Sequence, residues 1–243
     1  MAKWVDLHCH VLPGVDDGPA DIPTAVTLVQ GLQNLGFTEI HPTPHQREHF
    51  WIPTPEDVDA AVKSLRKSLE EVHSEVTICT PAAENMWDVL FLERFEKGLC
   101  TPYEGGKALL IELPPTTDLP PQFSERVFAF RMKGQLPVLA HVEFYKELMG
   151  DPIQAEKLAS QAALLVNLSS IGGIRGRQAR QMSRNLVRHG LVHGAATDVH
   201  NQNDVSFCQM GIEWIQSNMG DDVVQFLLCD GPKSILVGEI PEW

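Results

Sequence analysis

The chain has 243 residues, 43% of them hydrophobic, which is enough to bury a large core in one domain. Its formal net charge of -13 argues against a nucleic-acid groove, which needs a basic stripe. The five cysteines form no Cys-x-x-Cys pair, and no apolar run approaches a secretory leader or a membrane span, so we expect a single cytoplasmic domain over residues 1–243, without disulfides and without membrane insertion.

A short buried strand is predicted over residues 3–8, and histidines follow at its end. Side chains alternate between the two faces of a strand, so His8 and His10 point the same way. A Pro-Gly turn then brings Asp16 and Asp17 back toward the same strand end. A single histidine here would be an ordinary polar residue, but His-x-His followed by two acids indicates one wall of a metal site.

Helices and short strands alternate along the rest of the chain. Asp21 is a candidate N-cap and Gly36 a stop signal for the first helix, and Thr54-x-x-Asp57 resembles a capping box for the second. The predicted helices span residues 21–35, 54–73, 86–97, 122–133, 153–161, 176–189, 203–219 and 221–228, and the further strands span 39–42, 75–83, 108–112, 136–141, 163–168 and 194–198.

Seven strands that alternate with helices imply right-handed crossovers and a parallel sheet. In a closed β/α barrel the carboxyl ends of the strands share one rim. An open doubly wound sheet is the alternative, but it would spread these ends along a line. A barrel of seven βα units would gather nine residues that lie at or just beyond strand ends: His8, His10, Asp17, His45, Glu84, Glu112, His141, Asp198 and His200.

These strand ends form a series of motifs, namely Asp6-Leu7-His8-Cys9-His10, Val15-Asp16-Asp17-Gly18, Thr43-Pro44-His45, Ala83-Glu84, Leu110-Ile111-Glu112, Ala140-His141-Val142-Glu143 and Thr197-Asp198-Val199-His200-Asn201. In this order and at these intervals the chain resembles the polymerase and histidinol phosphatase (PHP) superfamily, in its bacterial branch of capsular and exopolysaccharide protein-tyrosine phosphatases. The resemblance runs from Asp6 nearly to the C-terminus. It implies a distorted TIM-like (β/α)7 barrel with a metal site at the C-terminal strand ends.

The resemblance also implies three divalent ions, usually manganese, with iron or zinc as alternatives. Hydroxide between the first two ions would attack phosphorus in line, and Glu84, Asp198 and His200 would be the catalytic positions. The implied ligand groups are His8, His10, Glu84 and Asp198 for one ion; Glu84, Glu112 and His141 for the second; and Asp17, His45 and His200 for the third.

Two arginines with which family members generally hold the phosphoryl group are absent here. Phe144 occupies one of these positions, and the five residues after Asn201 contain no arginine. Arg47 and Arg175 are the candidates for binding substrate instead, with Lys146 as a weaker one. For Arg175, a solvated position at the start of a helix is an equally good interpretation.

A cysteine-dependent tyrosine phosphatase would need an arginine six positions after its nucleophile. The residues six positions after the five cysteines are Val15, Asn85, Gly106, Trp214 and Ile235. We therefore expect all five cysteines to be small buried hydrophobic residues. The remaining histidines are predicted to be structural, at or beyond helix ends (His73, His189, His193), or to lie in a surface loop (His41, His49).

The predicted function is that of a metal-dependent phosphomonoesterase acting on a phosphotyrosine protein, and the resemblance suggests the tail of a membrane-associated tyrosine kinase as its partner. A phosphatase acting on a sugar phosphate or on histidinol phosphate is the alternative within the same fold. A metal-binding regulatory module that holds a kinase tail without turnover is the alternative from another class. An oligomer is compatible with each of the three.

Overall fold

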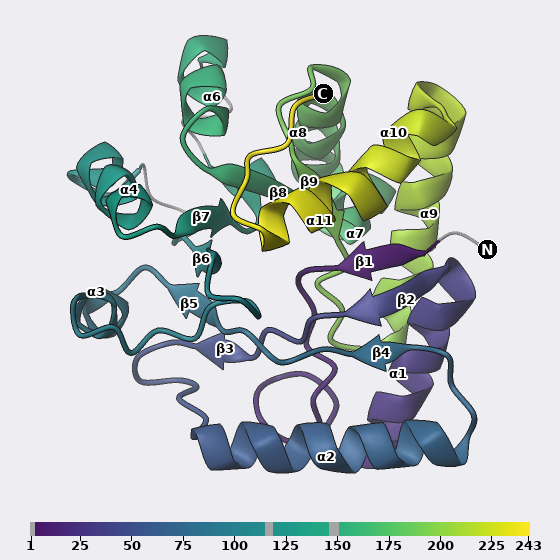
Figure 1. The fold of residues 1–243 in the computed structure, drawn as a ribbon. Helices are drawn as coiled ribbons and strands as arrows, with labels where there is room; N and C mark the ends of the chain where they lie inside the picture. The colour runs from purple at the N-terminus through teal and green to yellow at the C-terminus, as the bar shows by residue number, and fades with distance from the viewer. Residues whose placement is uncertain (1–2, 115–118, 146–150) are drawn as a thin grey trace.

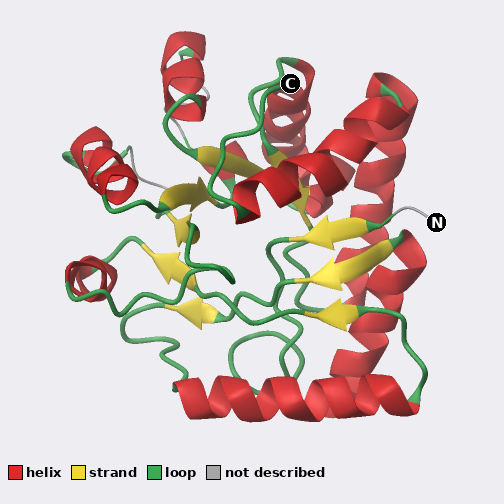
Figure 2. Ribbon diagram, in the orientation of Figure 1, coloured by secondary structure: helices red, strands yellow, loops and turns green. Residues whose placement is uncertain are grey.

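The computed structural model describes residues 3–114, 119–145 and 151–243 (Figure 1). Short parallel strands lie at the centre, and helices surround them (Figure 2). The strands are β1 (Trp4–Asp6), β2 (Phe37–Ile40), β3 (His45–Gln46), β4 (Thr77–Ile78), β5 (Glu84–Met86), β6 (Ala108–Glu112), β7 (Leu136–Leu139), β8 (Ala163–Asn167) and β9 (Gly194–Ala196).

Most helices follow strands and pack on the outside of the sheets. They are α1 (Ile22–Leu35), α2 (Pro55–Glu71), α3 (Val89–Glu96), α4 (Phe123–Met132), α6 (Pro152–Ala159), α7 (Leu168–Gly172), α8 (Gly176–Arg188), α9 (Gln202–Met219), α10 (Asp221–Gln225) and α11 (Gly231–Leu236). A 3-10 turn covers Val142–Phe144, and a π-helical turn over Phe226–Asp230 connects α10 to α11.

The strands form two parallel sheets, of order β1-β2-β4 and β3-β5-β6-β7-β8-β9. The chain passes from the first sheet to the second twice, between β2 and β3 and between β4 and β5. Pro42, Pro44 and Pro81 lie in these two passages, and proline cannot donate a ladder hydrogen bond. The strand predicted over residues 75–83 is therefore wrong in its bounds, because only Thr77–Ile78 of that range is a strand and β5 begins beyond Pro81, at Glu84.

Hydrogen bonds join the segments that follow the first and last strands. The backbone N–H of Asp198 donates to the carbonyl of His8 at 2.8 Å, and that of His10 donates to Val199 at 3.1 Å. The Asp6 carboxylate accepts hydrogen bonds from the backbone N–H of Thr197 at 3.1 Å and from its hydroxyl at 2.5 Å. The ends of β1 and β9 are thus held together although no ladder pairs these two strands within the described chain.

Several helix boundaries differ from those predicted. The helix predicted from Met86 begins only at Val89, because Met86 belongs to β5 and Asp88 caps α3 through a bond from the N–H of Phe91 at 2.8 Å. The helix predicted over residues 221–228 ends earlier, at Gln225. The short helices α7 and α11 and the two-residue strand β3 were not predicted, since two to six residues give too little periodicity to recognise.

Two glycines allow α7 and α9 to cross in close contact. A Cβ at Gly172 would lie 2.1 Å from the carbonyl oxygen of Phe207, and one at Gly211 would lie 2.2 Å from that of Leu168. Every residue of α7 is buried. The close crossing thus fixes α7, which directly follows β8 and precedes the segment that carries Arg175.

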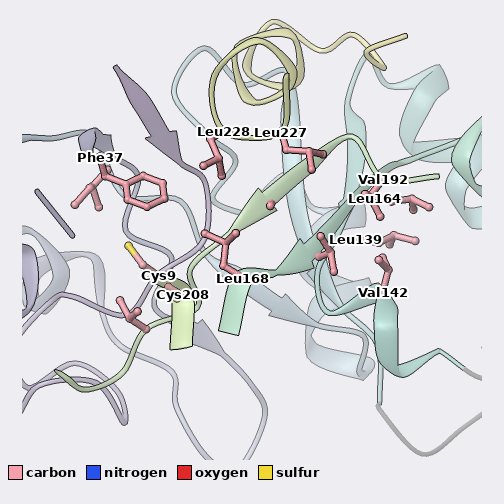
Figure 3. Close-up of a cluster of buried hydrophobic side chains, with 14 of the residues drawn as sticks. Cys9, Phe37, Leu139, Val142, Leu164, Leu168, Val192, Cys208, Leu227 and Leu228 are labelled. Atoms are coloured by element: carbon pink, nitrogen blue, oxygen red, sulfur yellow. The ribbon is translucent and has the colours of Figure 1, made fainter. Parts of the chain in front are cut away.

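The core has two parts. The larger one fills the space between strands and helices, and Figure 3 shows a region of it with Cys9 and Cys208 among apolar side chains. The smaller one lies between the strands and includes Leu7, Leu110 and Val138. Cys9, Cys208 and Cys229 are buried as predicted, whereas Cys79 and Cys100 are only partly buried. Among the described helices, none combines the length and the apolar character needed to cross a bilayer.

Candidate metal centre

The predicted donors lie in or close to short parallel strands, most of them at or just after the carboxyl end. His8 and His10 follow β1, His45 lies in β3 and Glu84 opens β5. The other predicted donors lie at the end of β6 (Glu112), after β7 (His141), after β9 (Asp198 and His200) and in the loop before α1 (Asp17). The structure brings all nine side chains into one cluster, in which each lies in at least one group of donor atoms no more than 4.8 Å apart.

The cluster centres on Glu84, which is 1% exposed. Its Oε1 lies 3.2 Å from Nε2 of His8 and 2.8 Å from Nε2 of His141. Its Oε2 lies 2.6 Å from Nδ1 of His45 and 3.5 Å from Nε2 of His10. A single carboxylate therefore faces four imidazoles from three segments of the chain.

Asp17 and His200 complete the more exposed side of the cluster. Oδ1 of Asp17 lies 3.3 Å from Nε2 of His45 and 3.2 Å from Nε2 of His200. The rings of His10 and His200 stack, with centroids 4.1 Å apart. One compact donor group therefore consists of Asp17 with His10, His45 and His200.

Asp198 and His141 approach the cluster from an unusual backbone conformation. Both have left-handed φ angles, 50° and 55°, which aspartate and histidine tolerate better than most residues. Oδ1 of Asp198 lies 3.6 Å from Nε2 of both His8 and His10. Such strained conformations concentrate at functional sites, where the surrounding structure holds them.

Two orienting residues were not among the predicted site residues. Asp16 accepts a hydrogen bond from Nδ1 of His10 at 2.7 Å, which leaves Nε2 to face the cluster. The side-chain amide of Asn167 lies 2.9 Å from both Nδ1 of His141 and Oδ2 of Asp198. Asn167 ends β8, so the alternation of strands and polar strand ends was the signal that could have found it; an amide is simply not a typical metal ligand.

The electrostatics of the cluster are dominated by buried carboxylates. Burial raises the pKa of Glu112 to about 7, and the charge of Glu84 contributes to the rise. Burial lowers the pKa of the imidazoles, but facing carboxylates outweigh it and raise the pKa of His45 to about 11 and that of His141 to about 10. Burial also lowers the pKa of His200, but Asp17 and Asp198 outweigh it and raise this pKa to about 9. The carboxylates thus attract positive charge, which either protons or metal cations can supply.

A cavity of about 380 Å³ opens over the cluster. Arg47, Trp51, Phe144 and Arg175 line it together with six of the nine predicted donors. Nη2 of Arg175 lies 3.9 Å from Oδ2 of Asp198, and half of this arginine side chain is exposed. Both arginines predicted to bind substrate therefore border the cavity, whereas Lys146 lies outside the described residues.

An aromatic wall forms one side of the cavity. The ring of Trp51 stacks on His45 with centroids 5.1 Å apart and planes at 23°. An antiparallel bridge joins Arg47 to Trp51, and the Arg47 guanidinium lies 4.5 Å from the centroid of the Phe50 ring. Phe50 is 65% exposed, so the loop presents apolar surface beside the cluster.

The other histidines differ in part from the prediction. His41 was expected in a surface loop but is buried, directly after the last residue of β2. His193 is also buried, and its Nδ1 accepts a hydrogen bond from the backbone N–H of Leu164 at 2.9 Å. His189 lies at the end of α8, where its ring contacts the carbonyl of Asn185, and His49 is exposed.

Comparison with known proteins places this geometry in a fold class and then in a family. The phosphotriesterase homology protein of Escherichia coli has a similar fold, with a TM-score of 0.58 at 11% identity over 97% of this chain and 99% of that one. The family model for capsular polysaccharide synthesis, CpsB/CapC, matches residues 4–237. The chain belongs to the CpsB/CapC family, and the predicted resemblance is confirmed.

Relatives of known name extend over nearly the whole chain. Tyrosine-protein phosphatase YwqE of Bacillus subtilis is 27% identical over 235 residues, which cover 96% of this chain and 91% of the relative. Tyrosine-protein phosphatase CpsB of Streptococcus pneumoniae is 24% identical over 97% and 99% of the two chains. A crystal structure from the study of YwqE and CpsB as metal-dependent tyrosine phosphatases superposes with a TM-score of 0.85 at 25% identity, over 97% of this chain and 95% of that one.

Proposed function

We propose that this chain is a metal-dependent phosphomonoesterase that hydrolyses phosphotyrosine in proteins and acts in the regulation of capsular or exopolysaccharide synthesis. The observation that supports this most strongly is the convergence of nine imidazole and carboxylate side chains beneath one cavity. The named relatives supply the substrate class. The five free cysteines support a reducing compartment, so we place the protein in the cytoplasm.

The frame that we propose is a single domain over residues 1–243, folded as a distorted (β/α)7 barrel. In this frame β2 with β3, and β4 with β5, each count as one interrupted strand. The hydrogen bonds that hold the ends of β1 and β9 together support closure between the first and last units. Closure of this kind would put the carboxyl ends of all strands on one rim.

Two features of the cluster fit bound cations. The Nε2 atoms of His8 and His10 face each other at 3.3 Å, an arrangement that a shared cation between two lone pairs would stabilise. Oε2 of Glu112 is buried and has no hydrogen-bond donor among the residues that the structure describes. The donor set is nitrogen and oxygen only, which suits manganese, iron or zinc.

We assign three divalent ions, manganese by preference, to this cluster. Glu84 faces ligands of all three groups, which supports a bridging role. The ligands would be His8, His10, Glu84 and Asp198 for the first ion; Glu84, Glu112 and His141 for the second; and Asp17, His45 and His200 for the third.

When bound, such ions lower the pKa of water toward about 7 and neutralise charge on a phosphoryl group. The chain's own residues prepare the site. Asp16 and Asn167 hold His10 and His141 in one orientation, and Arg175 at the cavity edge is placed to donate to phosphoryl oxygens. The ring of Trp51 keeps water from one side of His45.

A small phosphate ester is the second candidate substrate. Phe144 lines the cavity at a position where family members generally carry arginine. The absence of that arginine weakens the binding of a phosphoryl group. A sugar or histidinol phosphate with its own polar groups would depend less on that arginine. A binding module for the tail of a membrane-associated kinase, without turnover, is the third candidate, and an oligomer is compatible with each.

The test is phosphate release from phosphotyrosine peptides, sugar phosphates and histidinol phosphate, measured with manganese-loaded protein with and without chelator. We expect turnover of the peptides, lost on chelation. Turnover of a small phosphate alone would favour the second candidate, and binding of the peptides without release would favour the third.

A further inference from the structure

A second group of metal-capable side chains lies where β2 and β4 end. Ile40 pairs with Ile78 in the parallel register of the two strands, and the backbone N–H of Cys79 donates to the carbonyl of Ile40 at 2.8 Å. Since side chains alternate along each strand, Glu39, His41 and Cys79 share one face. Ile40 and Ile78 point to the opposite face, into the core beneath the helices.

The three donor atoms converge. A carboxylate oxygen of Glu39, a ring nitrogen of His41 and Sγ of Cys79 lie within 4.8 Å of one another. Oε1 of Glu39 is 2.9 Å from Nε2 of His41. Zinc-ligand bonds of about 2.0–2.3 Å in tetrahedral directions need ligand atoms roughly 3–4 Å apart, so small inward shifts would suffice.

His41 carries an independent sign of a missing partner. His41 is 3% exposed, and its Nδ1 has no hydrogen-bond partner within the described part of the chain. The ring packs edge-on against Tyr103, with centroids 6.0 Å apart, so that side offers no polar partner for the nitrogen. Buried imidazoles normally use both nitrogens, and because Nε2 already faces Glu39, a cation bound through Nδ1 would give this ring its second partner.

The charges around the group favour a cation. The carboxylates of Glu39 and Glu104 both act on His41 and Cys79. Among the described residues, Arg66 acts on Cys79 and Lys233 interacts with Glu39, and each of these positive charges also contacts another group. Arg66 donates to the carbonyl of Ile78 at 2.9 and 2.6 Å. Nζ of Lys233 lies 3.1 Å from Sγ of Cys229.

We propose that Glu39, His41 and Cys79 bind a zinc-type divalent cation that ties β2 to β4. One carboxylate oxygen, one imidazole nitrogen and one thiolate are the ligands, and the thiol releases its proton to solvent when the cation binds. The group shares no residue with the other candidate donor groups of the described chain, and it alone contains sulfur. Its chemistry therefore differs from that of the nitrogen and oxygen cluster beneath the cavity.

Cobalt(II) is the probe for this site, because a cobalt–thiolate bond gives a charge-transfer band in the near ultraviolet. Metal-free full-length protein is titrated with cobalt(II), and the band is expected in the wild type. Cys79→Ser should abolish it, whereas Cys100→Ser, at another partly buried cysteine, should leave it unchanged. His41→Gln should weaken the cobalt affinity reported by the band at least about tenfold.

Should one of these variants fail to fold, a zinc protection experiment on the wild-type protein tests the same proposal. Bound zinc is expected to slow alkylation of Cys79 in the wild-type protein, measured by peptide mass spectrometry, without slowing alkylation of Cys100. The proposal is overturned if the wild type shows no thiolate band, if Cys79→Ser keeps it, or if zinc leaves the alkylation of Cys79 unchanged. Each of these results would leave an ordinary hydrogen bond between His41 and Glu39 beside a free thiol.

Discussion

Arg175 is the residue whose role the structure sharpens most. Sequence alone left it between a phosphate ligand and a solvated helix residue. In the fold its guanidinium lies at the cavity edge, 3.9 Å from Asp198. Arg177, two residues later, is exposed at the start of α8 and does not line the cavity.

Replacing Arg175 by alanine should therefore lower kcat/KM for a phosphotyrosine peptide. The loss of a charge-assisted hydrogen bond is worth about 1.5–3 kcal/mol, or roughly a 10- to 150-fold decrease. Steady-state kinetics of the manganese-loaded variant measure this, with Arg177→Ala as the matched control. Equal kinetics for Arg175→Ala and wild type would remove Arg175 from the site.

Asn167 is a side-chain amide that contacts two of the predicted metal ligands. Its amide holds His141 and Asp198 at 2.9 Å each. Asn167→Ala should weaken manganese affinity by about 10- to 100-fold, as removal of such orienting partners generally does. Titration calorimetry checks this, with Ser170→Ala, a buried neighbour on α7, as the control. An unchanged affinity would show that packing alone orients the two ligands.

His193 offers a pH effect outside the cluster of predicted metal ligands. Burial lowers its pKa to about 4, below the ordinary 6.5, so the folded protein excludes a proton that the unfolded chain binds. Its contribution to stability is therefore complete above about pH 6.5 and is lost as the pH falls toward 4. Asparagine in its place keeps an acceptor for the N–H of Leu164 but does not titrate.

Between pH 7.5 and 5 the wild type should lose about 2 kcal/mol of unfolding free energy more than His193→Asn. Urea unfolding in the presence of chelator measures the difference without a contribution from metal loss. Parallel pH profiles for the two proteins would contradict the assignment.

At the scale of single elements, α2 illustrates a boundary that local chemistry determines. The hydroxyl of Thr54 accepts from the N–H of Asp57 at 3.2 Å, and the Asp57 carboxylate accepts from the N–H of Thr54 at 3.3 Å. Both halves of the predicted capping box are therefore present, and the helix begins at Pro55.

Thr54→Ala should destabilise the protein by about 1 kcal/mol, because it leaves an N–H of the first turn without its acceptor. Thr54→Ser keeps a hydroxyl and should remain within a few tenths of a kcal/mol of the wild type. Denaturant unfolding of the three proteins compares them. A Thr54→Ala variant as stable as the serine variant would mean that water caps the helix equally well.

The central strands show where sequence patterns lose resolution. The pattern over residues 75–83 predicted one strand, but Pro81 breaks the ladder and Glu84 opens a new strand in the second sheet. Two-residue strands such as β3 have no periodicity of their own. Their positions follow from pairing with neighbours, as His45 pairs with Glu84, and pairing between distant segments cannot be read locally.

For the molecule as a whole, the alternation of helices and strands predicted the α/β class with parallel strands, and the family followed from its motifs. The nine candidate donors were recognised because His, Asp and Glu recur at successive strand ends in one order, although each alone would be an ordinary polar residue. Asn167 was missed, and Asp16 was placed near the site without a role of its own, because both residues orient other side chains. That role depends on distances such as the 2.7 Å between Asp16 and His10, which only the folded chain defines.

The most direct test of the whole account is metal content and phosphate release measured on the same preparation. Protein loaded with manganese and freed of excess metal should retain about three ions at the cluster beneath the cavity and release phosphate from a phosphotyrosine peptide, and chelation should abolish both together. Phosphate release that persists after the ions are gone, or a carefully loaded protein that retains none, would contradict the claim that these nine side chains form a catalytic metal centre.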